Sequence, residues 1–196
     1  MEREIKRMVR KARASWWDDG IVEMVSGGSL VVIGGVGLLV SRFPDSLFFK
    51  LVWILVLFGL ILGGKRVVRW LKSRYVWPEY GYAEPSRKGG AGSLVWVVVA
   101  MVALFLSVIL FEHPVANFLI SLVPFCIFLS VAQYAGLNRF VVFGFLTLLA
   151  GIGLAFLRVK FNDAVSIELL FAGGVLIVSG IFRWSSLKRR AKVDGQ

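Results

Sequence analysis

Six long apolar segments, separated by turns and basic stretches, constrain this sequence more than any other feature. Each is close to the roughly 20 apolar residues that a helix needs to cross a bilayer. With 58% hydrophobic residues and a mean hydropathy of +0.78, the chain is too apolar for a soluble domain of 196 residues. The pattern predicts an all-helical integral membrane protein with six spans, at Val22–Ser41, Leu47–Gly64, Leu94–Phe111, Val115–Gln133, Phe140–Leu157 and Ile167–Phe182.

An internal repeat relates the first two spans to the last two. Residues 28–42 match residues 144–158 at six of fifteen positions, and residues 60–74 match residues 176–190 at six of fifteen with the same offset. A fixed spacing marks a repeated unit, so we expect three consecutive hairpins of which the first resembles the third. These hairpins are predicted at 21–64, 94–138 and 139–182, with turns at Pro44, Pro114 and Lys160.

Glycines recur at seven-residue spacing along several spans, which returns them to one helix face after two turns. Bare faces of this kind let helix backbones approach closely in lipid. Close packing is therefore predicted, within the chain or with a homo-oligomer or membrane complex partner, at Gly28, Gly35, Gly144, Gly151, Gly173 and Gly180.

The net charge of +11 comes from basic residues beside the apolar spans, which favours anionic lipid over nucleic acid as a partner. Of the 23 Lys and Arg residues, 19 lie in residues 1–20, the loop 65–93, Arg139 and the tail 183–196, and 4 lie in the three hairpin turns. By the positive-inside rule, this bias predicts a multi-pass plasma-membrane protein with both termini in the cytoplasm.

Residues 1–20 predict an amphipathic interfacial helix, because Ile5, Met8, Val9 and Trp16 share one face among cationic neighbours. The acidic residues Asp18, Asp19 and Glu23 then suit the positive end of the first span as helix caps. A catalytic or metal-binding carboxylate pair is the alternative for the two aspartates.

The loop 65–93 opens as a basic extension of the second span and continues as a Pro-, Gly- and Tyr-rich linker. Its aromatic and basic residues favour interfacial anchoring, with nucleotide stacking or partner binding as alternatives. The candidate lipid or partner contacts of this loop and the N-terminal helix are Arg7, Arg10, Lys11, Trp16, Trp17, Arg69, Trp70, Lys72, Arg74, Tyr75, Trp77 and Tyr80.

Familiar catalytic and phosphate-binding motifs are absent from the sequence, and the single His113 and single Cys126 leave no His- or Cys-based cluster. We therefore expect no enzyme activity, cofactor or metal site. The turns could bring His113 near Glu112, Asp45, Asp163 and Glu168 as a pH-responsive or metal-binding cluster, although a solvated histidine is the simpler interpretation. Every acidic residue is predicted at a span end or in a turn, which argues against ion-coupled transport.

The glycine-rich hairpins, exemplified by Gly28 to Pro44 and Gly144 to Arg158, resemble the repeats of HdeD-like small membrane proteins, a family associated with acid resistance. The segments Trp16–Glu23 and Tyr75–Pro85 look like those of an uncharacterised family of prokaryotic integral membrane proteins. Both resemblances imply a small polytopic protein, and neither implies a catalytic residue.

Two functions follow as expectations. The first is a non-catalytic scaffold or accessory subunit that acts through helix packing and through lipid or partner contacts on its basic cytoplasmic face. The alternative is a small transporter or channel component, or a membrane substrate-binding subunit.

Overall fold

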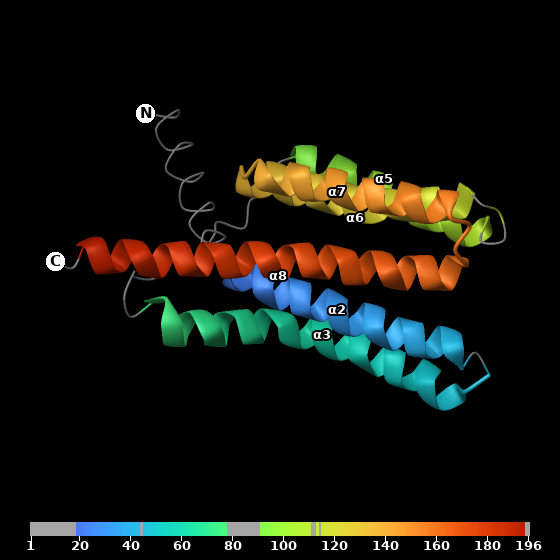
Figure 1. Cartoon of the computed structure of the whole chain (residues 1–196), viewed down its shortest axis with the longest axis horizontal. Coiled ribbons are helices and arrows are strands. Elements are labelled where there is room, and N and C mark those ends of the chain that lie inside the picture. The colour runs from blue at the N-terminus through green and yellow to red at the C-terminus, as the bar shows by residue number, and fades with distance from the viewer. Residues whose placement is uncertain (1–18, 44, 78–90, 111–112, 114, 195–196) are drawn as a thin grey trace.

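The computed structural model describes residues 19–43, 45–77, 91–110, 113 and 115–194, and every regular element among them is a helix (Figure 1). The predicted N-terminal helix and the turn residues Pro44 and Pro114 lie outside this described part. In chain order the helices are α2 (Ile21–Arg42), α3 (Leu47–Tyr75), α5 (Ala91–Ile109), α6 (Val115–Ala135), α7 (Arg139–Phe156) and α8 (Phe161–Asp194).

Four of these helices, α2, α6, α7 and α8, are long and apolar enough to cross a membrane. A fifth is added when the two parts of α3, Leu47–Leu60 and Leu62–Tyr75, are taken as one bent span. The apolar part of α5, Val95–Ile109, falls short of the length required. The structure thus supports a helical membrane protein with four to five candidate spans.

The helices form two layers, α2 with α3 and α5 with α6 and α7, and α8 lies between them (Figure 1). Helix α2 packs along α8, and α3 packs on α2, whereas α6 and α7 lie on the other side of α8 and α5 packs on α6. Helices α7 and α8 are consecutive, but each packs more extensively on another helix, α7 on α6 and α8 on α2. Helix α2 likewise packs more extensively on α8 than on α3, its neighbour in the chain.

Glycines set the close approach of α2 to α8. A Cβ built on Gly27 would lie 2.6 Å from the backbone oxygen of Gly173, and one built on Gly173 would lie 2.6 Å from that of Gly27. Farther along α2, a Cβ on Gly34 would lie 2.7 Å from the backbone oxygen of Ser166. Gly20 has a φ of 76°, a left-handed conformation, and also lies against Gly180. Small residues, glycine above all, allow two helix backbones to lie this close.

Gly28 and Gly35 do not pack on another described helix, so of the two kinds of predicted packing, within the chain or with a partner, only packing with a partner stays a prediction there. A Cβ on either glycine meets no described atom within 4 Å. The reason is rotation: each lies one position, about 100°, around the helix from Gly27 or Gly34, which face α8.

An aromatic cluster joins the layers near one end of the bundle. Phe128 and Ala132 of α6 and Phe140 of α7 pack with Ala172 and Leu176 of α8. We call this the Glu23 end, because α2 begins there with Glu23 in its first turn. The opposite end, where α8 begins, is the Asp163 end.

Candidate ligand pocket and buried polar groups

A pocket of about 500 Å³ lies between the two layers, within the range typical of small-molecule sites. Side chains from α2, α3, α6, α7 and α8 line it, and they are almost all apolar. On α2 its lining runs from Glu23 to Ile33, which corresponds to about 15 Å along the helix. Pro124, the proline inside α6, also lines it. The pocket is therefore a long apolar slot, and its polar lining residues include Glu23 and Lys65 at the Glu23 end.

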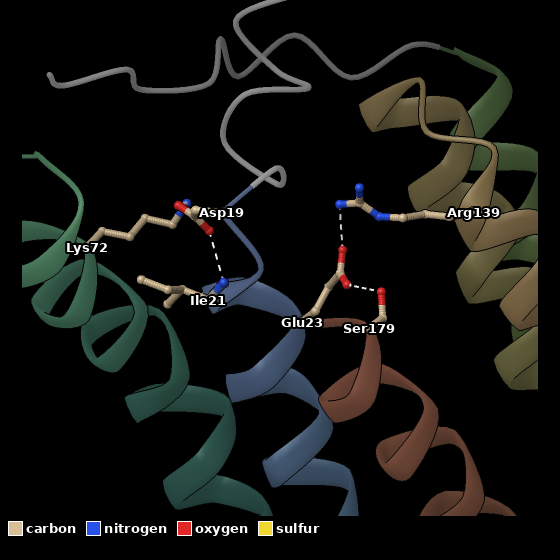
Figure 2. Close-up of polar contacts among 6 residues, drawn as sticks. All are labelled: Asp19, Ile21, Glu23, Lys72, Arg139 and Ser179. Atoms are coloured by element: carbon tan, nitrogen blue, oxygen red, sulfur yellow. Dashed lines mark hydrogen bonds and ion pairs between the residues drawn. The ribbon is translucent and has the colours of Figure 1, made fainter. Parts of the chain in front are cut away.

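Glu23, one of the residues that line the pocket, is a buried, paired carboxylate (Figure 2). Its Oε1 lies 2.5 Å from Nη2 of Arg139, at the start of α7, and the Glu23 side chain is fully buried. Its Oε2 accepts a hydrogen bond of 2.5 Å from the Ser179 hydroxyl of α8. Helix α2 and the consecutive helices α7 and α8, which are distant from α2 in sequence, thus meet at one carboxylate. A buried charge is tolerated when a partner of opposite charge and hydrogen bonds compensate for lost water.

Asp19 makes a second buried ion pair, with Lys72 of α3 (Figure 2). The Lys72 ammonium donates to Asp19 Oδ2 at 2.5 Å, and the two side chains expose 1% and 5% of their surfaces. Asp19 Oδ1 accepts the backbone N–H of Ile21 at 2.9 Å, so Asp19 also satisfies a free donor at the start of α2. The N-cap of α2 is Gly20 rather than an aspartate, but Asp19, one residue earlier, accepts this hydrogen bond and fixes α3 to α2.

Lys72 is accordingly a correction to the predicted lipid or partner contacts. The basic extension of α3 does not place all of its cations on the surface, because the Lys72 side chain reaches inward to Asp19. Around it, Arg69, Arg74 and the aromatic residues Trp70 and Tyr75 are exposed.

An aromatic and basic patch continues from α3 onto α8. Tyr75 packs edge-on against Trp184, with ring centroids 6.3 Å apart, and the Lys188 ammonium lies 5.0 Å from the centre of the Trp184 ring. Trp77 follows the end of α3 and is partly buried. The predicted contacts Arg7, Arg10, Lys11, Trp16, Trp17 and Tyr80 lie outside the described residues.

The other predicted glycines lie at helix contacts. Gly180 faces Met24 and the Gly20 backbone oxygen, and Gly144 faces Phe125 and Phe128 of α6. A Cβ on Gly151 would contact that of Ser121 and would lie 3.2 Å from Oε1 of Glu168. Gly151 and Gly35, equivalent in the repeat alignment, thus have different surroundings.

Glu168 corrects the prediction that every acidic residue lies at a span end or in a turn. It lies two turns inside α8 and exposes 3% of its surface. Span six was predicted to start at Ile167, but α8 starts at Phe161, which moves Glu168 from the boundary into the helix.

The predicted acidic and histidine cluster at the turns is not assembled in the described part of the chain. No group of three His, Cys, Asp or Glu residues there could hold a metal ion. Asp163 instead accepts a hydrogen bond of 2.5 Å from Ser41 of α2, and His113 is exposed. Glu112 lies outside the described residues.

Arg139 and Ser179 are the residues that sequence reasoning missed. In the sequence Arg139 is a lone basic loop residue, and its isolation between two apolar spans is the available signal, because a single cation there needs a partner. Nothing in the sequence separates Ser179 from other serines of the spans.

No protein-family model matches the chain, and neither a curated protein nor a solved structure matches it. The fold and the pocket define an all-helical protein with several helices long and apolar enough to cross a membrane.

Proposed function

We propose that this chain is a non-catalytic membrane protein that binds one acyl chain of an anionic lipid in the pocket between its two layers. The pocket is the observation that carries this proposal. It is long and apolar, as an acyl chain requires, and the exposed cation Lys65 is among its lining residues. An apolar tail in the slot would place its anionic headgroup beside Lys65 and the basic residues that follow on α3.

The proposed membrane arrangement has six spans, with α3 and α5 completing the set. Helices α3 and α8 have 29 and 34 residues, which corresponds to about 44 and 51 Å, against a hydrocarbon thickness of about 30 Å. Their surplus carries the basic residues at the Glu23 end. The charge bias supports a cytoplasmic Glu23 end in the plasma membrane, with residues 1–20 on the same surface. The resemblance to HdeD-like proteins stays a prediction.

A scaffold function is the second candidate, and the unpacked glycines favour it. Gly28 and Gly35 of α2, and Gly59 and Gly63 of α3, have no described atom within 4 Å of a built Cβ. Small residues left open on a span suit the close approach of another helix. We propose these open small-residue faces of α2 and α3 as contacts with a second copy or a membrane partner. Cross-linking in native membranes that Gly63→Leu abolishes and Leu62→Ala leaves intact would support it, whereas equal cross-linking of both variants would contradict it.

The lipid proposal is tested by what remains on the purified protein. We expect mass spectrometry of the protein extracted from native membranes to show about one tightly bound anionic lipid per chain. After delipidation, the protein should take up phosphatidylglycerol in preference to phosphatidylcholine from mixed vesicles. A protein that carries no lipid, or that takes up both lipids equally, would contradict the proposal.

A further inference from the structure

Glu168 lies inside the part of α8 that crosses the membrane in the proposed arrangement. It follows the first residue of the helix by seven positions, or about 10 Å along the axis. A hydrocarbon core of about 30 Å places it roughly a third of the way across. Its side chain does not line the lipid pocket, and it points elsewhere in the bundle.

Three helices enclose the Glu168 carboxyl group. A Cβ on Gly151 of α7 would touch both Glu168 Oε1 and the side chain of Ser121 on α6, so these groups meet at the junction of α6, α7 and α8. Ser121 exposes none of its surface, and its hydroxyl donates to the backbone oxygen of Phe118. Glu168 Oε1 is buried without a hydrogen-bond partner among the described residues.

Among the described residues of the helices that pack on α8, no cation is positioned to compensate a charge on Glu168. Helix α6 contains no charged residue, and α7 has Arg139 alone, at the Glu23 end. On α2 the charged residues are Glu23 and Arg42, near its two ends, and the nearest charged residue on α8 is Asp163, which is itself acidic. Arg158 and Lys160 lie in the turn before α8 and are exposed.

We propose that Glu168 is an intramembrane proton-binding site, at which a neutral carboxyl group is held between α8 and the α6–α7 layer. An isolated carboxylate in this apolar interior would be costly, and an added proton removes the charge. Glu23 provides the contrast within the same chain: it is as deeply buried, but Arg139 and Ser179 compensate its charge. Loss of the Glu168 proton would leave a bare charge at the junction, which favours entry of water or separation of α8 from α6 and α7.

Infrared spectroscopy of the full chain in lipid vesicles tests the proposal, because the carbonyl band of a neutral carboxyl group is separate from the bands of a carboxylate. At neutral pH we expect a neutral-carboxyl band that Glu168→Gln removes and that Glu23→Gln and Asp163→Asn leave in place. Circular dichroism checks that each variant keeps its helices. A parent spectrum without this band, or a band that persists in folded Glu168→Gln, would overturn the proposal.

Carbodiimide labelling decides the question if Glu168→Gln does not fold, because it needs only the parent chain. The O–H of a neutral carboxyl adds across one C=N bond of dicyclohexylcarbodiimide: its proton goes to nitrogen and its oxygen to the central carbon. The acyl group then migrates to nitrogen, which gives a stable N-acylurea with no leaving group. We expect this adduct on the Glu168 peptide at neutral pH and its loss at alkaline pH. An unmodified Glu168 in a parent that also lacks the neutral-carboxyl band would refute the site.

Discussion

Glu23 and Arg139 join the two helix layers through an ion pair of 2.5 Å between Oε1 and Nη2, beside the pocket between the layers. Glu23 belongs to the layer of α2 and α3, and Arg139 begins α7 in the other layer. The Arg139 side chain is 13% exposed, whereas that of Glu23 is fully buried. The pair therefore fixes how far apart the layers lie at the end where the pocket has its polar residues.

Removal of one member of this pair should be more harmful than removal of both. Arg139→Gln leaves the buried Glu23 carboxylate without its cation, and breaking a buried pair in this way costs about 3–5 kcal/mol. In the double variant Glu23→Gln/Arg139→Gln no charge is stranded, so part of that stability should return. Unfolding of the three proteins by denaturing detergent measures the difference. Costs that simply add in the double variant would show that the two side chains do not interact.

Adjacent glycines on α2 should respond in opposite ways to the same substitution. A Cβ on Gly27 meets the Gly173 backbone oxygen at 2.6 Å, so Gly27→Ala must separate α2 from α8 at a cost of about 1–3 kcal/mol. Gly28→Ala meets no described atom within 4 Å and should be neutral, or gain up to about 1 kcal/mol of helix propensity. Thermal unfolding in detergent compares them. If Gly28→Ala were thermally less stable than Gly27→Ala, α2 would have to be rotated from the position described.

The same contrast shows what sequence could predict about the fold. The apolar segments and their turns predict the helices, and the basic residues after Gly64 predict the extension of α3, because these are local properties of the chain. Which glycine faces a neighbour depends on a rotation of about 100° per residue. Seven-residue spacing fits Gly28 and Gly35 as well as Gly27 and Gly34, and so cannot choose between them.

The candidate site was less predictable because it depends on contacts between distant residues. The packing of α8 on α2, in preference to α7, is a tertiary choice that the repeat does not reveal. It brings Ser179 to Glu23, and the position of α7 brings Arg139 to the same carboxylate. The burial of Glu168 follows from the earlier start of α8 at Phe161, where a polar first turn hid the beginning of the helix.

The two ends of α8 should lie on opposite sides of the membrane. Asn162 and Ser186 are both exposed on this helix and lie 24 positions, or about 36 Å, apart, which exceeds the roughly 30 Å hydrocarbon core. Single cysteines at these positions in a Cys126→Ala background should differ in intact cells. An impermeant maleimide should label residue 162, and residue 186 only after the membrane is opened. Labelling of residue 186 in intact cells would show that the orientation is the reverse of the one proposed.

Lys65 should affect which lipid the protein prefers more than how much lipid it binds. It is exposed at the pocket, so Lys65→Gln should reduce the preference for phosphatidylglycerol over phosphatidylcholine without loss of stability. Lys50→Gln, an exposed lysine of α3 near the Asp163 end, is the matched control and should leave the preference unchanged. Competition between the two lipids, measured by native mass spectrometry, gives the ratio. An equal effect of both substitutions would assign the preference to net charge alone.

The most direct test of the lipid-binding account is to fill the pocket and count the lipid that remains. Ile127 lines the pocket and is 48% exposed, so Ile127→Trp can place its ring in the slot without disturbing a closed core. Val142 is 56% exposed on α7 and does not line the pocket, so Val142→Trp adds the same ring elsewhere. Native mass spectrometry of both folded variants should show bound phosphatidylglycerol lost from Ile127→Trp and retained by Val142→Trp. Full retention of lipid by Ile127→Trp would contradict the account.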